Sequence, residues 1–307
     1  MKTKLRQQGV AVITALLLTT LAITIVASLF WQQQVQVRSI ENQRLQLQKQ
    51  WILRGAIDWS RLILKSDGQY STIDTLDEAW ATPLAETKLD QYVEDGSAEG
   101  AGDAAISGGA TDAQARYNLT NLCVGGAIIP REVIVFGRLL TNLGLNPALA
   151  SATAAMMERA QAKRDAASTD TAQPLNLLQV DDLLAVPGFT VEMLGKVRDF
   201  VVVLPRPTSV NANTASAEVL SARIGTLSVS DAAALVASRK GAAFRDLADL
   251  NSRITARWPG QVADRVNVRT SFFLVNGNAR VKRASMQVQS LVERRSGNTT
   301  VIWIREL

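Results

Sequence analysis

The clearest pattern in this sequence is an uncharged apolar segment of 22 residues near the N-terminus, residues 10–31. A helix of this length spans about 33 Å, enough to cross the roughly 30 Å hydrocarbon layer of a membrane. The nine residues before it contain Lys2, Lys4 and Arg6 and no acidic side chain. Positive charge on this side predicts that the N-terminus stays in the cytoplasm and that the rest of the chain is exported.

The helical pattern continues beyond the membrane segment. Apolar residues three or four positions apart, such as Trp59 and Ile63, predict a stripe that packs on the globular part. Residues 66–68, Ser-Asp-Gly, offer a stop signal, because glycine readily adopts the left-handed conformation just past a helix. We therefore expect a helix of about 55 residues, about 80 Å long.

Three further patterns divide the rest of the chain. Several glycines interrupt an acidic stretch between residues 69 and 124, and residues 130–257 are dense in alanine and leucine. After residue 258 the period becomes two, which is typical of strands, and we expect a three-strand meander with turns at Asn276-Gly277 and Gly297-Asn298. Residues 115–122 also resemble a strand. The expected helices are 132–143, 147–166, 180–184, 191–202, 215–220, 231–239 and 244–250.

Composition excludes several kinds of function. The 307 residues include no histidine and one cysteine, Cys123, so histidine-dependent catalysis, thiolate metal clusters and an intrachain disulfide are excluded. Three of the five net positive charges belong to the N-terminal leader, which leaves about +2 and no nucleic-acid signature. We therefore expect neither an enzyme nor a nucleic-acid-binding protein.

The acidic stretch is the one candidate for a metal site. Glu94, Asp95, Glu99 and Asp103 lie among glycines, and calcium prefers about six to eight oxygen ligands on a bendable backbone. A calcium-binding loop is one interpretation; a loop whose acids contact only water is the other. Their spacing does not match an EF-hand, so the sequence defines no ligand set.

The N-terminus has three interpretations: a secretory signal peptide, an uncleaved anchor, or a class III leader. The apolar run is longer than the 7 to 15 residues of a signal peptide. Residues 6–16, RQQGVAVITAL, resemble the leaders of type IV pilins and type II secretion pseudopilins. That resemblance implies cleavage between Gly9 and Val10 by a prepilin peptidase, followed by N-methylation of Val10.

Position five of such a mature chain is Thr14 here, where most family members carry a glutamate. The K-type minor pseudopilin lacks this glutamate and sits at the filament tip, where no subunit lies above it to pair with a carboxylate. Two more segments resemble K-type pseudopilins: residues 78–84, EAWATPL, and residues 115–122, ARYNLTNL. We interpret both as structural segments.

A rival resemblance lies at residues 210–220 and 232–247, which are similar to the helix-hairpin-helix modules of membrane-anchored DNA receptors. Such modules bind phosphates through glycine-rich turns. The turn candidates here, residues 224–227 and 186–189, lack the Gly-x-Gly pattern, and their flanks are not basic enough to drive phosphate binding. An inserted helical domain of K-type pseudopilins is the other interpretation.

These patterns together predict an α+β chain: a long N-terminal membrane-spanning helix packed on a small antiparallel sheet, in a pilin-like fold with a large inserted all-helical domain. The expected segments are a leader (1–9), the spine helix (10–66), the first β region (67–126), the helical domain (127–258) and the C-terminal strands (259–307).

The resemblance implies a minor pseudopilin that caps the type II secretion pseudopilus and primes its assembly, for export of folded periplasmic proteins. Its expected partners are the I-type and J-type pseudopilins, the prepilin peptidase, the inner-membrane secretion machinery and secreted exoproteins. The expected location is the bacterial inner membrane, with one span and a periplasmic globular part. The alternatives are an anchored periplasmic binding module, such as a DNA receptor, and a minor pilin of a type IV pilus.

Overall fold

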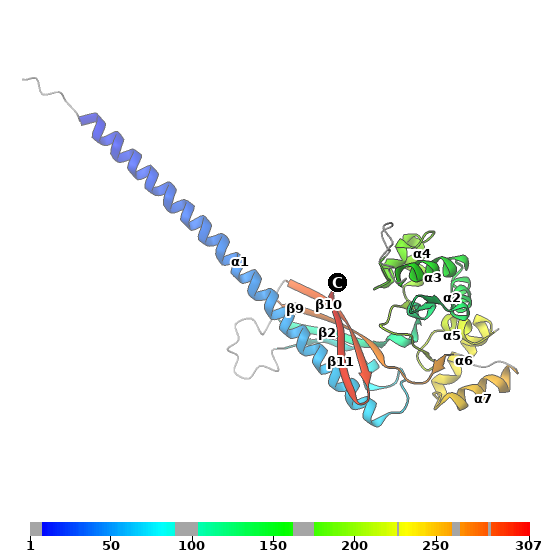
Figure 1. Ribbon diagram of the computed structural model, residues 1–307. Coiled ribbons are helices and arrows are strands. Elements are labelled where there is room, and N and C mark those ends of the chain that lie inside the picture. Colours follow the sequence, from blue (N-terminus) through cyan, green and yellow to red (C-terminus); the bar gives the residue numbers. More distant parts are fainter. Residues whose placement is uncertain (1–7, 90–103, 162–174, 226, 260–264, 282–283) are drawn as a thin grey trace, which may run out of the picture.

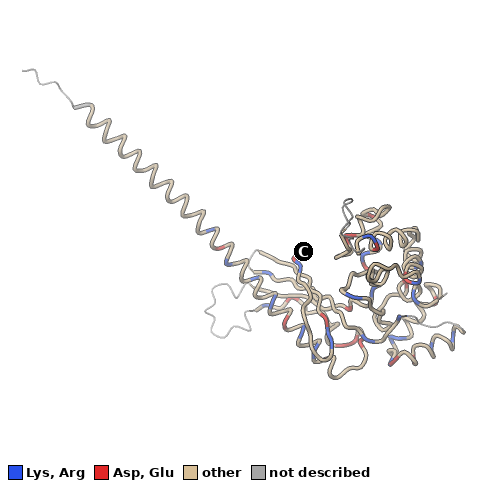
Figure 2. Tube along the Cα trace, in the orientation of Figure 1, with Lys and Arg blue, Asp and Glu red and all other residues tan. Residues whose placement is uncertain are grey.

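A single long helix dominates the computed structural model, which describes residues 8–89, 104–161, 175–225, 227–259, 265–281 and 284–307. Helix α1 (Gln8–Tyr70) extends far from the globular part (Figure 1). Residues 8–37 of α1 carry no charged side chain (Figure 2), and their large apolar side chains are half or more exposed, from 50% at Val26 to 74% at Trp31. By length and composition, this is the one helix in the described chain that could cross a membrane.

The predicted helix stop at residues 66–68 is wrong, because α1 continues to Tyr70 and contains 63 residues. Its length is therefore about 94 Å rather than 80 Å. Gly68 is needed for space: a Cβ atom there would lie 2.9 Å from Cδ of Arg294. The glycine thus allows a close approach between helix and sheet inside the last turns of α1.

The second half of α1 lies against one face of a five-stranded antiparallel sheet of order β1-β2-β9-β10-β11. The strands are β1 (Leu84–Lys88), β2 (Ala104–Asp112), β9 (Phe272–Val281), β10 (Ala284–Arg295) and β11 (Asn298–Glu306). Two buried clusters join helix and sheet: Leu53 and Ile57 with Ala279, Met286 and Val288, and Leu64 and Trp80 with Phe273, Val275 and Val292. Burial of these apolar side chains holds the spine on the sheet.

Neighbouring strands β2 and β9 come from distant parts of the sequence, and the helical region is inserted between them (Figure 1). This order of sheet, helices and sheet confirms the predicted α+β fold. The helices are α2 (Pro130–Asn142), α3 (Ala148–Gln161), α4 (Val191–Val197), α5 (Ala217–Arg223), α6 (Val229–Gly241) and α7 (Leu247–Arg257). They share one large core with short 3-10 helices η5 (Leu119–Leu122) and η6 (Val180–Ala185) and with the strand pairs β3 (Tyr117–Asn118)–β6 (Val201–Val202) and β7 (Val210–Asn211)–β8 (Val266–Asn267).

The remaining short elements are η1 (Ala79–Ala81) between α1 and β1, η4 (Ala113–Ala115) between the sheet and the insertion, and the pair β4 (Cys123–Val124) and β5 (Ala127–Ile128) before α2. A smaller cluster on the other face of the sheet joins Phe272, Leu274 and Leu291 to Ala113, Val202 and Leu204. The inserted region therefore packs on the sheet opposite α1.

The predicted turn at Asn276-Gly277 is wrong, although the C-terminal meander β9-β10-β11 is confirmed. Asn276 and Gly277 lie inside β9, where Gly277 pairs with Gly108 of β2 and with Val288 of β10. A Cβ on Gly108 would lie 2.3 Å from the Asn276 carbonyl oxygen, so tight strand packing requires glycine here. The β9–β10 connection falls at residues 282–283, outside the described residues. The other predicted turn, Gly297-Asn298, is off by one residue: the turn residues are Ser296 and Gly297, with φ of 51° and 77° as a type I′ turn requires, and Asn298 already pairs with Arg295.

Several element boundaries in the insertion also differ from prediction. Residues 191–202 form α4 and then β6, and residues 115–122 are mostly 3-10 helix rather than strand. Helix α7 begins after its cap Asp246 rather than at Phe244. The cause is Asn213, whose side chain accepts a hydrogen bond from Phe244 N (2.8 Å) and donates one to Phe244 O (2.9 Å). These bonds hold the Phe244 backbone outside the helix.

We expect Gly108→Ala to lower the free energy of unfolding of the full chain by about 1–3 kcal/mol, because the added methyl overlaps the Asn276 carbonyl. The matched control is Gly195→Ala in α4, where a Cβ meets nothing within 4 Å and where alanine favours helix by up to about 1 kcal/mol. Thermal unfolding of the detergent-solubilised protein, followed by circular dichroism, measures both. Equal melting temperatures for the two variants would contradict this account of the β2–β9 contact.

Candidate functional site

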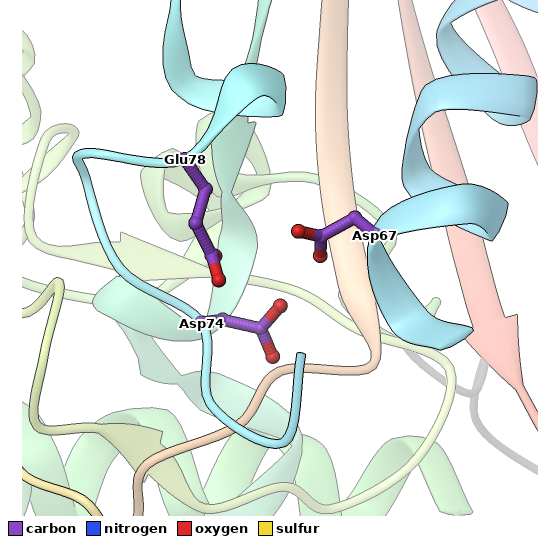
Figure 3. Close-up of side chains that lie close together, drawn as sticks. All are labelled: Asp67, Asp74 and Glu78. Atoms are coloured by element: carbon purple, nitrogen blue, oxygen red, sulfur yellow. The ribbon is translucent and has the colours of Figure 1, made fainter. Parts of the chain in front are cut away.

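Three carboxylates converge where α1 ends and the sheet begins (Figure 3). Asp67 comes from the last turns of α1, and Asp74 and Glu78 come from the segment that follows. Their nearest oxygen atoms lie within 4.8 Å of one another, which is close enough to hold a metal ion. The sequence alone did not group these residues, because their proximity depends on the chain turning back after Tyr70.

The guanidinium of Arg294, from β10, supplies the positive charge for this cluster. Its Nη1 donates to Asp67 Oδ2 at 2.6 Å, and its Nη2 donates to Asp74 Oδ1. The same side chain donates to the carbonyl of Thr270 at 3.2 Å and lies 4.8 Å from the centre of the Phe273 ring. The guanidinium of Arg294 therefore balances carboxylate charge that a metal ion would otherwise balance.

Glu78 has partners of its own. Its Oε2 accepts hydrogen bonds from Thr75 N (2.9 Å) and from Trp80 Nε1 (2.8 Å). The Trp80 ring contacts Phe273 edge-on, with centroids 5.1 Å apart. Residues 78–84 thus fasten the start of the β region to α1 and β9, which is the structural role that we expected of this segment.

Burial controls the ionisation of the cluster. Loss of water contact raises the pKa of Asp67 and of Asp74 above the usual carboxyl value, and the Arg294 guanidinium opposes this shift. Thr270 N also donates to Asp74 Oδ2 at 2.7 Å, which favours the ionised form. The donor set is that of a buried salt bridge rather than of a metal site.

A second buried carboxylate, Asp112, ties the insertion to the end of β2. It accepts hydrogen bonds from Gln114 N (2.7 Å), Asn211 Nδ2 (2.8 Å) and Thr214 Oγ1 (2.6 Å). Burial raises the pKa of Asp112, since these three hydrogen-bond partners are uncharged. Asn211 Nδ2 also donates to the carbonyl of Asp74 at 3.0 Å, so one side chain joins both carboxylate clusters.

Residues 115–122 form a hydrogen-bonded segment at the start of the insertion, just after β2 and η4. Asn118 donates to the carbonyl of Arg206 (2.8 Å) and accepts from Leu204 N (3.1 Å), and Asn121 bonds both the N and the O of Thr208. Tyr117 is buried and donates to Glu132, which forms a buried ion pair with Arg223. Burial raises the pKa of Tyr117 well above its usual value.

The helix-hairpin-helix turns are used for packing within the chain. Ile224 and Leu227 are buried, and the Gly225 carbonyl accepts a hydrogen bond from Arg138 Nη1 at 2.7 Å. At the second turn, a Cβ on Gly188 would lie 3.0 Å from the Leu149 side chain. The apolar side chains of both turns, Ile224 and Leu227 in the first and Val186 and Phe189 in the second, therefore pack into the core, whereas Pro187 and Gly188 are exposed.

The sequence-predicted site residues have different outcomes. Gly9 and Val10 lie in the first turn of α1, and Thr14 Oγ1 donates to the carbonyls of Val10 and Ala11, both at 3.0 Å. The processing and assembly roles of these residues stay predictions. The calcium candidates Glu94, Asp95, Glu99 and Asp103 lie outside the described residues.

An apolar groove of about 420 Å³ runs between α1, η1 and β2. Trp59 and Ile63 line it from the helix, Trp80 and Pro83 from the η1 segment, and Gly109 from β2. The prediction that Trp59 packs on the globular part is wrong, because its side chain is 52% exposed at this groove. An exposed tryptophan beside an apolar groove is suited to contact with another apolar helix.

Comparisons with known proteins agree on one family. Two family profiles, both described as type II secretion system (T2SS), protein K, match residues 115–206 and 210–265. The type II secretion system protein K of Pseudomonas aeruginosa is 34% identical over 146 residues, which cover 45% of this chain and 40% of that protein. The match thus spans less than half of the curated relative.

A solved structure has the same fold. One chain in the crystal structure of the GspK-GspI-GspJ complex from the enterotoxigenic Escherichia coli type 2 secretion system aligns with a TM-score of 0.68. The alignment covers 88% of this chain and 99% of that chain, at 18% identity. At this identity the likeness is one of fold, and it extends over most of the chain.

We expect Arg294→Met to destabilise the full chain by about 3–5 kcal/mol, because it leaves two buried carboxylates without their cation. The control is Arg54→Met on the exposed side of α1, which should change stability by less than about 0.5 kcal/mol. Thermal unfolding of both variants measures the difference. A wild-type melting temperature for Arg294→Met would mean that this salt bridge does not hold the helix on the sheet.

Proposed function

Because this chain belongs to the type II secretion system protein K family, we propose that it is the minor pseudopilin that caps the pseudopilus tip and primes its assembly. Through this role it serves the export of folded periplasmic proteins across the outer membrane. The observation that carries the proposal is the combination of an exposed apolar helix with a sheet that carries a helical insertion. It is an assembly protein and not an enzyme.

The proposed partners are the I-type and J-type pseudopilins. The similar chain of known structure was solved in a GspK-GspI-GspJ complex, which supports this choice. We assign the contact with their helices to the groove beside Trp59, since it is apolar and continues the exposed face of α1. The prepilin peptidase, the inner-membrane secretion machinery and secreted exoproteins complete the proposed set.

The proposed location is the inner membrane, with residues 10–31 as one span. Lys2, Lys4 and Arg6 keep the N-terminus in the cytoplasm, and the sheet and insertion lie in the periplasm. Four threonine hydroxyls in the span are satisfied within the helix: Thr14, Thr19, Thr20 and Thr24 all donate to carbonyls of the preceding turn. These four side chains can therefore enter lipid with their hydroxyl groups paired.

The lack of a carboxylate at Thr14 supports a position at the tip. A glutamate in the apolar core of a filament needs the amino-terminal charge of a neighbouring subunit, and a buried carboxylate without a partner is costly. A subunit with no neighbour above it gains by having threonine. The family matches favour neither a DNA receptor nor a type IV minor pilin.

Cleavage by the prepilin peptidase tests the proposal directly. When the chain is co-expressed with the peptidase, we expect loss of the nine leader residues and a mature protein that begins with N-methylated Val10. Mass spectrometry of the intact protein and of its N-terminal peptide measures both events. Gly9→Leu is the control and should stay uncleaved, whereas an uncut wild-type chain in the presence of active peptidase would refute the pseudopilin assignment.

Thr14→Glu tests the position at the tip. We expect it to reduce exoprotein secretion several-fold in a strain that lacks the native gene, because a carboxylate in the span without a cationic partner is costly. Thr14→Gln is the matched neutral control and should secrete normally. Immunoblots must show equal membrane levels of both variants, and wild-type secretion by Thr14→Glu would contradict the tip argument.

A further inference from the structure

A polar cavity of about 400 Å³ lies where the sheet meets the inserted region. It is bounded by the end of α1, the β10–β11 turn and the two segments 206–209 and 267–271. Its lining is rich in hydrogen-bond donors and includes four arginines, Arg206, Arg269, Arg294 and Arg295. The proposed function uses none of these side chains to contact a partner.

The charge of this cavity is unbalanced. None of the described residues that line it is acidic. Arg294 is neutralised by Asp67 and Asp74, and Arg206 pairs with Glu293 while its guanidinium lies 4.7 Å from the centre of the Phe272 ring. Within the described part of the chain, Arg269 and Arg295 form no ion pair, so two exposed guanidinium groups at the cavity keep their charge uncompensated.

The cavity walls are held in place by hydrogen bonds from the protein itself. Gln114 accepts from Ser271 N at 2.6 Å and donates to the Ser209 carbonyl at 2.8 Å, which links the two segments across the wall. Thr208 Oγ1 accepts from Asn118 Nδ2 at 3.1 Å, so its own hydroxyl proton remains available to a ligand. The cavity walls and the Thr208 hydroxyl are therefore in place before any ligand arrives.

We propose that this cavity binds a carboxylate-bearing ligand through Arg269 and Arg295. Planar guanidinium groups match carboxylates with paired, charge-assisted hydrogen bonds, and nearby hydroxyls add further donors. The volume lies near the lower end of ligand sites, about 300–1,000 Å³, so it suits a group with several carboxylates rather than one small ion. A free polycarboxylate and the acidic side chains of a polypeptide both present this chemistry.

Calorimetric titration of the full chain in lipid nanodiscs tests the proposal and separates the two sources. One arm uses citrate, and the other uses the blocked tetrapeptide acetyl-Glu-Asp-Glu-Asp-amide, both at low ionic strength. We expect saturable binding of at least one probe. Tighter binding of the peptide identifies a polypeptide ligand, and tighter binding of citrate identifies a free polycarboxylate.

The double variant Arg269→Gln/Arg295→Gln should weaken that binding about tenfold or more, because it removes charge-assisted donors. Both side chains are exposed, so the variant should keep the wild-type melting temperature. The matched control, Arg54→Gln/Arg245→Gln, removes the same charge from exposed positions outside the cavity lining and should bind as wild type. Absence of saturable binding by both probes, or equal weakening by the two double variants, would overturn the proposal.

Discussion

The fold depends on one buried guanidinium. Arg294 reaches from β10 to the end of α1, and its nitrogen atoms bond Asp67, Asp74 and the carbonyls of Leu64 and Thr270. A buried arginine is stable only when its charge is paired and its donors are used, so this side chain constrains every segment around it. It ties the last turns of the spine helix to the sheet, and Gly68 leaves room for the arginine, which passes close to it.

The inserted region is attached by side-chain amides rather than by a broad apolar interface alone. Asn211 bonds both Asp112 and the Asp74 carbonyl, while Asn118 and Asn121 bond backbone groups of residues 204–208. An asparagine presents a donor and an acceptor side by side, so it can satisfy two polar groups of an irregular chain at once. Such anchors let the insertion leave and rejoin the sheet without unpaired backbone groups at these points.

The sequence was most informative where a local pattern of residues is compatible with one kind of secondary structure. An uncharged run of 22 residues has to be a spanning or buried helix, and period-two alternation near the C-terminus identified the meander. It was least informative where glycine serves packing: Gly68 and Gly277 have the signature of a stop and a turn, yet both allow close contacts with residues far away in the chain. The Arg294 cluster could not be predicted, because Asp67 and Arg294 are joined only by the tertiary fold.

The part of the spine helix outside the membrane also exposes apolar side chains to water. Beyond the membrane span, α1 still exposes large apolar side chains, including Val35, Ile40, Leu47, Trp51 and Leu62. Single exposed apolar residues are ordinary, but a series along one helix that leads to an apolar groove is typical of an interaction surface. The sheet covers Leu53, Ile57 and Leu64, and among the residues described the fold has no further element that covers the exposed series. Helices of neighbouring subunits would cover it, and the hydrophobic effect would then drive the assembly that we propose.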